Sequence, residues 1–415
     1  MKAKAYLVSL VTLLSTLTLG QKPSTPLSSS SRWILDANGS RVKLRCINWA
    51  GHMEANIPEG LHKQPITYIA DWVASAGFNC VRLTYSIDMA LNPGLSVRDS
   101  FRAAAAETRI AEDAMLGLYD SAVAMNPFLG GASVSDVFAK VIDELWQRGI
   151  MTILDNHVSK ASWCCNLDDG NGWWSDAPIY LAANSRYFDS AKWMDGLRAM
   201  ARWSQNRPGI VGMSLRNELR ATWTQILFAS GTWYTKMTAA ARAVHEINPD
   251  LLVVVGGLNG GTDLSPLRTR DMDTSSFRNK LVWETHDYPF TVTTPETGNC
   301  DVTKANYGLF FGFVLEQGKS YTGPLWLSEF GVNMQGGPNA GLSDEDFTYL
   351  TCLVSYMENN DADWALWAIQ GSYYVRDGVL DNEETWGALD RDWKDWRNKD
   401  FKSLLGNMWT TTQRP

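Results

Sequence analysis

The sequence predicts an α/β fold and, within that class, a closed (β/α)8 TIM barrel. Eight short apolar runs alternate with helical stretches, and polar residues stand at the ends of most of these runs. The chain has 415 residues, of which 45% are hydrophobic and 20% charged, so it can bury a large core. Strictly alternating strands and helices form parallel strands joined by crossover helices. Eight such units suit a closed barrel better than an open sheet.

The predicted strands are short and rich in apolar and β-branched residues. In chain order they are Val42–Asn48, Phe78–Thr84, Ile150–Asn156, Ile210–Arg216, Leu251–Gly256, Leu281–His286, Leu325–Ser328 and Asp363–Ala368. The helical segments between them include Ile66–Ala76, Val134–Arg148, Ser190–Gln205, Trp233–Ile247 and Asp344–Glu358. No Gly-rich phosphate-binding loop follows any strand, which argues against a nucleotide-binding sheet.

Two additions to the barrel are predicted. Asn38-Gly39 stands between two alternating runs in the segment 33–44, and this dipeptide is typical of a type I′ turn in an N-terminal β-hairpin. Asn38 also begins a glycosylation sequon. After the second strand, a long insertion carries two predicted helices, Val97–Glu107 and Ile110–Ala124. In a barrel it would lie at the C-terminal face, either as one wall of a cleft or as a packing elaboration.

The N-terminal segment has the parts of a secretory signal peptide. Lys2 and Lys4 precede an apolar stretch, Tyr6–Leu19, and the small residue Gly20 follows. We therefore expect residues 1–20 to be a signal peptide, residues 21–31 a flexible Ser/Pro-rich segment, and residues 32–415 one domain. No other segment is apolar enough to cross a bilayer. The protein is expected to be secreted, extracellular and monomeric.

The net charge and the cysteines indicate which partners are unsuited to this protein and whether disulfides can form. The net charge is −8, with no run of five like charges, which argues against nucleic acid and membrane surfaces as partners. Cysteines in an oxidising compartment can pair. Cys46 and Cys80 lie in predicted strands, where they are better interpreted as small buried hydrophobic residues. The remaining cysteines could form bridges whose connectivity the sequence leaves open: Cys164, Cys165, Cys300 and Cys352.

Two glutamates, Glu218 and Glu329, each close a short apolar run. Carboxylates are almost never buried unless they are paired or used. A pair of carboxylates on two rigid strands is what glycoside hydrolysis requires. The 19 tryptophans also fit a carbohydrate binder, since they outnumber the 14 Tyr and the 14 Phe. The other strand ends carry residues expected on the same face: Arg82, His157, Asn217, His286, Tyr288 and Trp367.

This set of eight residues resembles the active-site pattern of glycoside hydrolase family 5, the cellulase-like retaining β-glycosidases. The resemblance runs from about Trp33 to Leu405. It includes the strings Leu-Asp-Asn-His and Ser-Leu-Arg-Asn-Glu-Leu-Arg, which are similar to a plant and fungal branch of the family. It implies that Glu218 is the general acid/base and Glu329 the nucleophile. Many members have Pro where this chain has Leu219, so substrates of the better-known cellulases do not transfer directly.

The resemblance also implies how the two glutamates are tuned. Arg82 would keep Glu329 ionised. His286 and Tyr288 would supply hydrogen bonds to the two carboxylates and separate their roles. Two carboxyl groups this close cannot both ionise freely, so one of them should hold a proton.

Three further residues would bind the sugar that is cleaved. By resemblance, Trp367 would be the floor beneath this sugar, His157 would bind one of its hydroxyls, and Asn217 would donate to its 2-OH. Aromatic residues just past strand ends could be additional platforms or could cap the barrel: Trp49, Trp163, Trp173, Trp174, Trp223 and Tyr373.

The expected function is a secreted retaining β-glycoside hydrolase. It would cleave β-linked glucan or a related cell-wall polysaccharide by double displacement, without cofactor or metal. Exo-acting β-glycosidase and transglycosylase activities remain open alternatives. A non-catalytic carbohydrate-binding barrel would have no reason to keep both glutamates. A metal-dependent hydrolase is disfavoured because the five His form no H-x-H or H-E-x-x-H motif.

Overall fold

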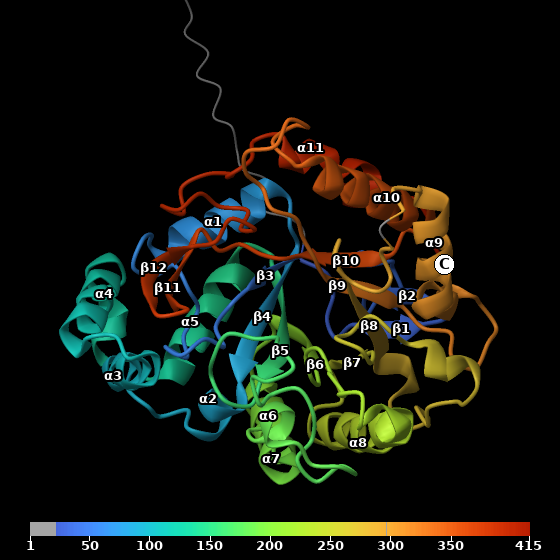
Figure 1. The fold of residues 1–415 in the computed structure, drawn as a ribbon, viewed down its shortest axis with the longest axis horizontal. Helices are drawn as coiled ribbons and strands as arrows, with labels where there is room; N and C mark the ends of the chain where they lie inside the picture. Colours follow the sequence, from blue (N-terminus) through green and yellow to red (C-terminus); the bar gives the residue numbers. More distant parts are fainter. Residues whose placement is uncertain (1–21, 296) are drawn as a thin grey trace, which may run out of the picture.

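The computed structural model describes residues 22–295 and 297–415, and the predicted signal peptide lies outside them. Eight parallel strands close into a barrel in the order β10-β3-β4-β5-β6-β7-β8-β9 (Figure 1). The eight predicted strands are confirmed, with ends shifted by a few residues. Their bounds are β3 Arg45–Trp49, β4 Cys80–Ser86, β5 Met151–Val158, β6 Ile210–Ser214, β7 Leu252–Gly256, β8 Leu281–Asp287, β9 Leu325–Phe330 and β10 Asp363–Leu366.

Helices surround the barrel and cover the outer faces of its strands (Figure 1). The principal ones are α1 Ile66–Ala76, α5 Val134–Gln147, α7 Ser190–Ser204, α8 Ile226–Ile247, α9 Cys300–Phe310 and α10 Asp344–Asn360. Shorter helices are α2 Ile87–Leu91, α6 Ala182–Ser185 and α11 Phe401–Leu404, and a final hairpin pairs β11 Ser372–Arg376 with β12 Val379–Glu383. Helix α8 begins before its predicted start at Trp233: Ser230 and Gly231 are poor helix formers and hid its first turns in the sequence, but the structure extends the helix through them.

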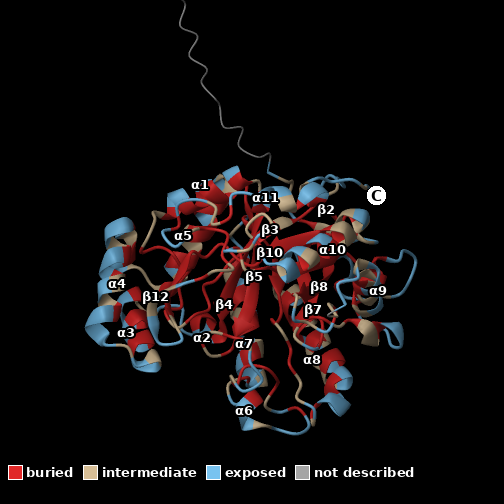
Figure 2. Cartoon of the chain, turned by 45° about the horizontal axis from the view of Figure 1, so that its top comes forward, coloured by how far each residue is buried: buried red, intermediate tan, exposed pale blue. Residues whose placement is uncertain are grey.

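The inner face of the barrel changes from apolar to polar along β4 and β5. Residues two apart share one face of a strand. On β4, Cys80 packs in the lower core while Arg82 lies one layer higher. On β5, Ile153 is in the same lower core, and Asp155 and His157 follow above it. Figure 2 shows the buried residues gathered on the central strands. The polar layer therefore lies at the C-terminal end of the barrel.

The N-terminal hairpin is present, but it begins earlier than predicted. Strand β1, Ser28–Ser30, pairs antiparallel with β2, Trp33–Leu35. Leu27 and Ile34 are fully buried in the lower barrel core. The expectation that residues 21–31 form a flexible segment is therefore wrong for this part, because the hairpin packs beneath the barrel.

The Asn38-Gly39 turn forms with a different geometry from the one predicted. Gly39 has a φ of 78°, but Asn38 is not among the residues with positive φ, which a type I′ turn requires at both positions. Asp36 Oδ1 instead accepts hydrogen bonds from the backbone N–H groups of Asn38 and Ser40. Because this carboxylate organises the turn, the type I′ prediction is wrong.

The insertion after β4 contains the two expected helices, α3 Val97–Thr108 and α4 Glu112–Met125. They pack against each other at one side of the barrel (Figure 1). Across residues 22–295 and 297–415, no helix combines the length and apolarity needed to cross a bilayer.

All six cysteines are paired. Cys46 and Cys80 face each other in register on β3 and β4 and form a disulfide, so their interpretation as unpaired hydrophobic residues is wrong. Cys300 and Cys352 join α9 to α10. The adjacent residues Cys164 and Cys165 are bonded to each other.

Candidate active site

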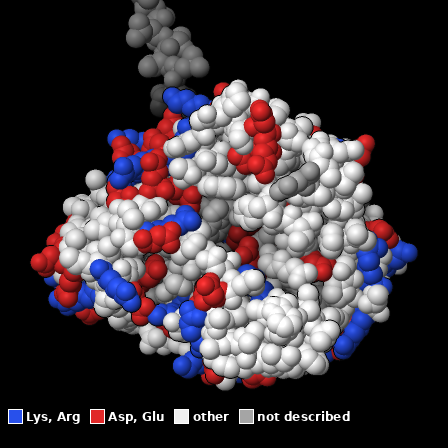
Figure 3. Space-filling model, in the orientation of Figure 1, with Lys and Arg blue, Asp and Glu red and all other residues white. Residues whose placement is uncertain are grey.

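A cavity of about 620 Å³ opens at the C-terminal end of the barrel. Figure 3 shows this face hollowed near its centre, with acidic atoms inside the hollow. The walls come from the loops that follow β5 to β8 and from residues at and beyond the ends of β9 and β10. Among the lining residues are His157, Trp163, Cys164, Cys165, Glu218, Tyr288, Phe290, Glu329, Trp367, Arg376, Glu384 and Trp386. No residue of α3 or α4 lines this cavity, so the insertion is not its wall.

The two glutamates meet across the cavity. Glu329 lies within β9 and is 4% exposed, whereas Glu218 follows β6 and is less buried. One carboxylate oxygen of each and a ring nitrogen of His286 all lie within 4.8 Å of one another. Glu218 has a φ of 40°, a left-handed conformation that is strained for a residue with a side chain. Leu219, which follows it, is fully buried.

A buried arginine lies beneath the pair and contacts three carboxylates. Arg82 Nη1 is 2.5 Å from Glu329 Oε1, and Nη2 is 2.9 Å from Asp155 Oδ1 and 3.1 Å from Glu284 Oε1. Arg82 is fully buried. One guanidinium thus neutralises charge that would otherwise be costly to bury.

Burial and charge act in opposite directions on these carboxyls. Burial raises the pKa of Glu329, and the positive charges of His286 and Arg82 limit this rise. Burial also raises the pKa of Asp155 to about 7. The pKa of Glu284 is lowered to about 2, because Arg82 and His286 outweigh its burial. The contact between Arg82 and Glu329 is as expected, but Arg82 alone does not set the charge of Glu329.

His286 lies between the two glutamates. Its Nδ1 atom is 3.0 Å from Glu218 Oε1 and 3.7 Å from Glu329 Oε2. Burial lowers the pKa of this imidazole, but Glu329, Glu218 and Glu284 more than offset burial and raise it to about 10. His286 is therefore a cation at neutral pH. The Tyr288 hydroxyl donates to Glu329 Oε2 at 3.0 Å.

The pKa of His286 predicts how stability depends on pH. Because its folded pKa is raised from 6.5 to about 10, this group stabilises the fold fully below about pH 6.5. That contribution is lost as the pH rises through about 10. We expect His286→Gln to be less stable than the parent at pH 7 but to lose less stability between pH 7 and 10. Urea unfolding across this range measures both slopes, and equal slopes would refute the assignment.

The remaining predicted residues come from the C-terminal ends of β5, β6 and β10, and two of them contact the ring of His157. His157 Nδ1 is 2.6 Å from Asp155 Oδ2, and burial holds the pKa of His157 well below its ordinary value. Its ring stacks on Trp367, with centroids 5.5 Å apart and planes 17° apart. Asn217 Oδ1 accepts from Arg82 Nη2 at 3.0 Å, and its Nδ2 is 3.4 Å from His157 Nε2.

A match along most of the chain assigns the protein to a family. The family model described as Cellulase (glycosyl hydrolase family 5) matches residues 35–372. The chain belongs to glycoside hydrolase family 5. Membership in this family makes the protein a glycosidase.

Relatives and solved structures agree with the family 5 assignment. A glycosyl hydrolase 5 family protein of Chamaecyparis obtusa is 40% identical, over 98% of this chain and 70% of that protein. An endoglucanase of Paenibacillus polymyxa is 25% identical, over 90% of this chain and 85% of that protein. An endocellulase of Pyrococcus horikoshii solved with cellotetraose has a TM-score of 0.71 at 19% identity, over 94% of this chain and 100% of that chain. This last likeness shows the fold alone.

All eight predicted site residues come together in this family 5 barrel. Five of them line the cavity: His157, Glu218, Tyr288, Glu329 and Trp367. Arg82, Asn217 and His286 lie directly behind these, each no more than 2% exposed. Of the other aromatic candidates, Trp163 lines the cavity. The rest do not: Trp49, Trp173, Trp174 and Tyr373 are buried, and Trp223 is exposed.

Several residues of the site were missed by sequence reasoning. Asp155 and Glu284 lie two positions before His157 and His286, and strand alternation could have placed them on the same inner face. Glu384 and Arg376 pair at 2.7 Å beside Trp163. They come from the final hairpin and the turn after it, and no motif marks them.

Two side-chain groups have the composition of metal-ligand sets. One consists of Glu218, His286 and Glu329, and the other of His157, Cys164 and Cys165. In the first, His286 Nδ1 is engaged with Glu218, and in the second both sulfurs are in a disulfide. Disulfide sulfurs are not thiolates, so the second set lacks the deprotonated sulfur ligands that a metal ion needs.

Proposed function

We propose that this family 5 glycosidase is a secreted, retaining enzyme that cleaves β-linked glucan or a related cell-wall polysaccharide. The observation that carries the proposal is the close approach of Glu218 and Glu329, whose nearest oxygens lie within 4.8 Å. Retaining enzymes hold their carboxyl groups about 5–5.5 Å apart, while inverting enzymes need about 6.5–9.5 Å to admit a water. The endoglucanase relative from Paenibacillus polymyxa supports a β-glucan as substrate.

In the first step, Glu329 attacks the anomeric carbon of the sugar. As the glycosidic bond breaks, Glu218 acts as the general acid and gives a proton to the departing oxygen. The glycosyl group is then held as an ester on Glu329. Arg82 and the Tyr288 hydroxyl contact the two oxygens of Glu329, so they fix the direction of its attack.

In the second step, Glu218 acts as a base. It takes a proton from a water molecule, and the resulting hydroxide attacks the anomeric carbon and releases Glu329. Two inversions leave the product with its original β-configuration. The side chain of Glu218 is 17% exposed and that of Glu329 only 5%, so water and leaving group have better access to Glu218.

His286 places a positive charge beside both carboxylates during the two steps. Its Nδ1 atom is close to both carboxylates, and its raised pKa keeps it positive at neutral pH. When Glu218 loses its proton in the first step, the resulting negative charge is balanced by the imidazolium. Preorganised charge of this kind is a major source of transition-state stabilisation.

Aromatic side chains extend the cavity beyond a single sugar. Trp367 and Trp163 meet edge to face, with centroids 6.3 Å apart. Phe290 stacks on Tyr288 with ring centroids 5.2 Å apart and is 74% exposed. Several aromatic rings along one cavity suit an oligomeric or polymeric sugar substrate. We therefore place polysaccharide ahead of small aryl or alkyl glycosides.

The same proposal covers the organisation and location of the chain. Residues 1–20 are a signal peptide by their pattern, and residues 32–415 form a single catalytic domain that acts as a monomer. Three disulfides support an oxidising, extracellular setting.

The test is a hydrolysis screen in which the first product anomer is read by proton NMR. Purified enzyme is offered β-1,4-glucan, mixed-linkage β-glucan, β-mannan and aryl β-cellobiosides. We expect activity on a β-glucan and the β-anomer before mutarotation. Initial release of the α-anomer would contradict the retaining mechanism. Release of sugars only from chain ends, or transfer to added sugars, would instead favour the exo-acting or transglycosylase alternatives.

Removal of metal ions is expected to leave the activity unchanged. The reason is that the double displacement uses Glu218 and Glu329 directly as acid/base and nucleophile, and no step of it needs a metal ion. Dialysis against EDTA followed by the same glucan assay measures this. Loss of activity that added Zn²⁺ or Mn²⁺ restores would revive a metal-dependent mechanism.

A further inference from the structure

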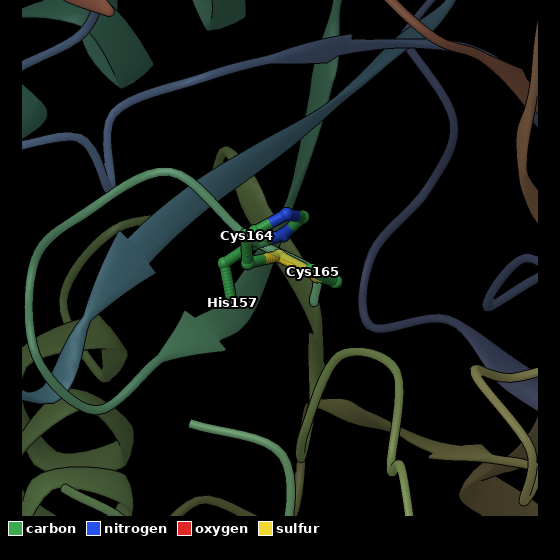
Figure 4. Close-up of side chains that lie close together, drawn as sticks. All are labelled: His157, Cys164 and Cys165. Carbon is green, nitrogen blue, oxygen red and sulfur yellow. A yellow bond between two sulfur atoms is a disulfide. The ribbon is translucent and has the colours of Figure 1, made fainter. Parts of the chain in front are cut away.

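The disulfide between adjacent residues Cys164 and Cys165 lies in the wall of the substrate cavity. Figure 4 shows its two sulfur atoms beside the ring of His157. A ring nitrogen of His157 and both sulfurs lie within 4.8 Å of one another. The Asn217 Nδ2 atom is 3.3 Å from Cys165 Sγ and 3.6 Å from Cys164 Sγ. The disulfide therefore touches a residue proposed to bind the sugar.

The contacts around Asn217 settle which way its amide faces. Its Oδ1 atom accepts from Arg82, and a guanidinium can only donate. The amide NH₂ therefore faces His157 and the two sulfurs. His157 is neutral and directs Nδ1 at Asp155, so its Nε2 lone pair accepts one amide hydrogen. The other hydrogen faces the disulfide.

A disulfide between adjacent residues restricts the unfolded chain very little, so it adds little to the free energy of unfolding. Disulfides stabilise mainly by closing loops, and the effect grows with loop length. Cys300–Cys352 spans 52 positions in sequence, whereas Cys164–Cys165 spans one. The chain-entropy account therefore assigns almost nothing to the Cys164–Cys165 bond. Its place beside Asn217 points to a role in the cavity.

We propose that the Cys164–Cys165 disulfide is a positioning element that holds the Asn217 amide ready for the sugar 2-OH. This rests on the proposed function of the site. The disulfide sulfurs accept the Asn217 N–H and so orient it before the substrate arrives. Because sulfur is a weak hydrogen-bond acceptor, breaking this contact when the sugar binds costs little free energy. A covalent pair of adjacent residues also has little freedom to turn away. The 2-OH then takes over this hydrogen bond, which strengthens in the transition state.

The test compares two substrates in the parent enzyme and in the double variant Cys164→Ala/Cys165→Ala. One substrate is 4-nitrophenyl β-cellobioside, and the other lacks the 2-OH on the sugar next to the nitrophenyl group. We expect kcat/KM of the variant to fall about threefold to tenfold on the complete substrate, the range of one hydrogen bond. On the 2-deoxy substrate we expect a fall of less than about twofold, because the affected contact is absent.

Controls separate positioning from a structural effect. Cys300→Ala/Cys352→Ala removes a distant disulfide and should lower the Tm without changing the ratio of the two substrates. Mild reduction of the parent by TCEP, with the reduced cysteines mapped by alkylation and mass spectrometry, supplies a second route if the alanine pair does not fold. It should give the same 2-OH-dependent loss and recover on reoxidation.

Equal losses on both substrates, or no loss, would overturn the positioning role. So would a parent enzyme that does not discriminate between the two substrates. The proposed function stands apart from these outcomes, because it depends on the anomer that the parent enzyme releases.

Discussion

Replacing Glu329 by alanine is expected to abolish glycoside hydrolysis, by roughly 10⁵- to 10⁶-fold, the size seen when other covalent nucleophiles are removed. The physical reason is that the glycosyl ester cannot form without the Glu329 carboxylate, whose two oxygens are held by Arg82 and Tyr288. Arg82 keeps Asp155 and Glu284 as partners, so the variant should remain folded. Initial rates on an aryl β-cellobioside measure the loss, and circular dichroism checks the fold.

Azide distinguishes the nucleophile from the acid/base. In Glu329→Ala, azide can enter the space left by the carboxylate and should yield only the α-glycosyl azide. The matched control is Glu218→Ala, which keeps the nucleophile and forms the ester from a substrate with a good leaving group. Azide should then attack that ester and yield the β-glycosyl azide. Recovery of the β-glycosyl azide by Glu329→Ala would show that Glu329 is the acid/base and would contradict its assignment as nucleophile.

Replacing Arg82 by methionine is expected to destabilise the fold by about 3–5 kcal/mol, the range for breaking a buried ion pair from one side. Methionine fills a similar volume but leaves Asp155, Glu284 and Glu329 without their shared cation. The carboxyls would then hold protons more tightly, so stability should rise as the pH is lowered from 7 towards 4. Urea unfolding at pH 5 and pH 7.5 measures both effects.

A second substitution tests this explanation. Glu284→Gln in the Arg82→Met background removes one uncompensated negative charge and should restore part of the lost stability. Glu284→Gln alone should destabilise, because Arg82 and His286 then lose a partner whose pKa they together lower to about 2. If the two changes are additive, the charge account of this cluster is wrong.

The barrel and the catalytic residues could be predicted because each has a local signature. Apolar runs bounded by polar residues mark the strands, and Glu218 and Glu329 stand out as carboxylates that close such runs. Parallel strands in a barrel bring their C-terminal ends to one face. Once eight strands are counted, residues far apart in sequence can be assigned to a single site.

Other features depend on contacts that no local pattern specifies. Cys46 and Cys80 form a bond because β3 and β4 pair in one particular register, which the sequence of either strand leaves open. The burial of Leu27 beneath the barrel likewise depends on how the hairpin docks. Asp155 and Glu284 were within reach of strand alternation, but their shared partner Arg82 is on a third strand.

Covalent trapping tests the assignment of Glu329 as nucleophile most directly. The parent enzyme is incubated with an activated 2-deoxy-2-fluoro β-cellobioside, which slows hydrolysis of the glycosyl ester so that it accumulates. Peptide digestion and mass spectrometry then locate the added mass. The account predicts a single label on Glu329, absent from Glu329→Ala and formed at a reduced rate in Arg82→Met. A label on Glu218, or no label during continued turnover with release of the α-anomer, would contradict it.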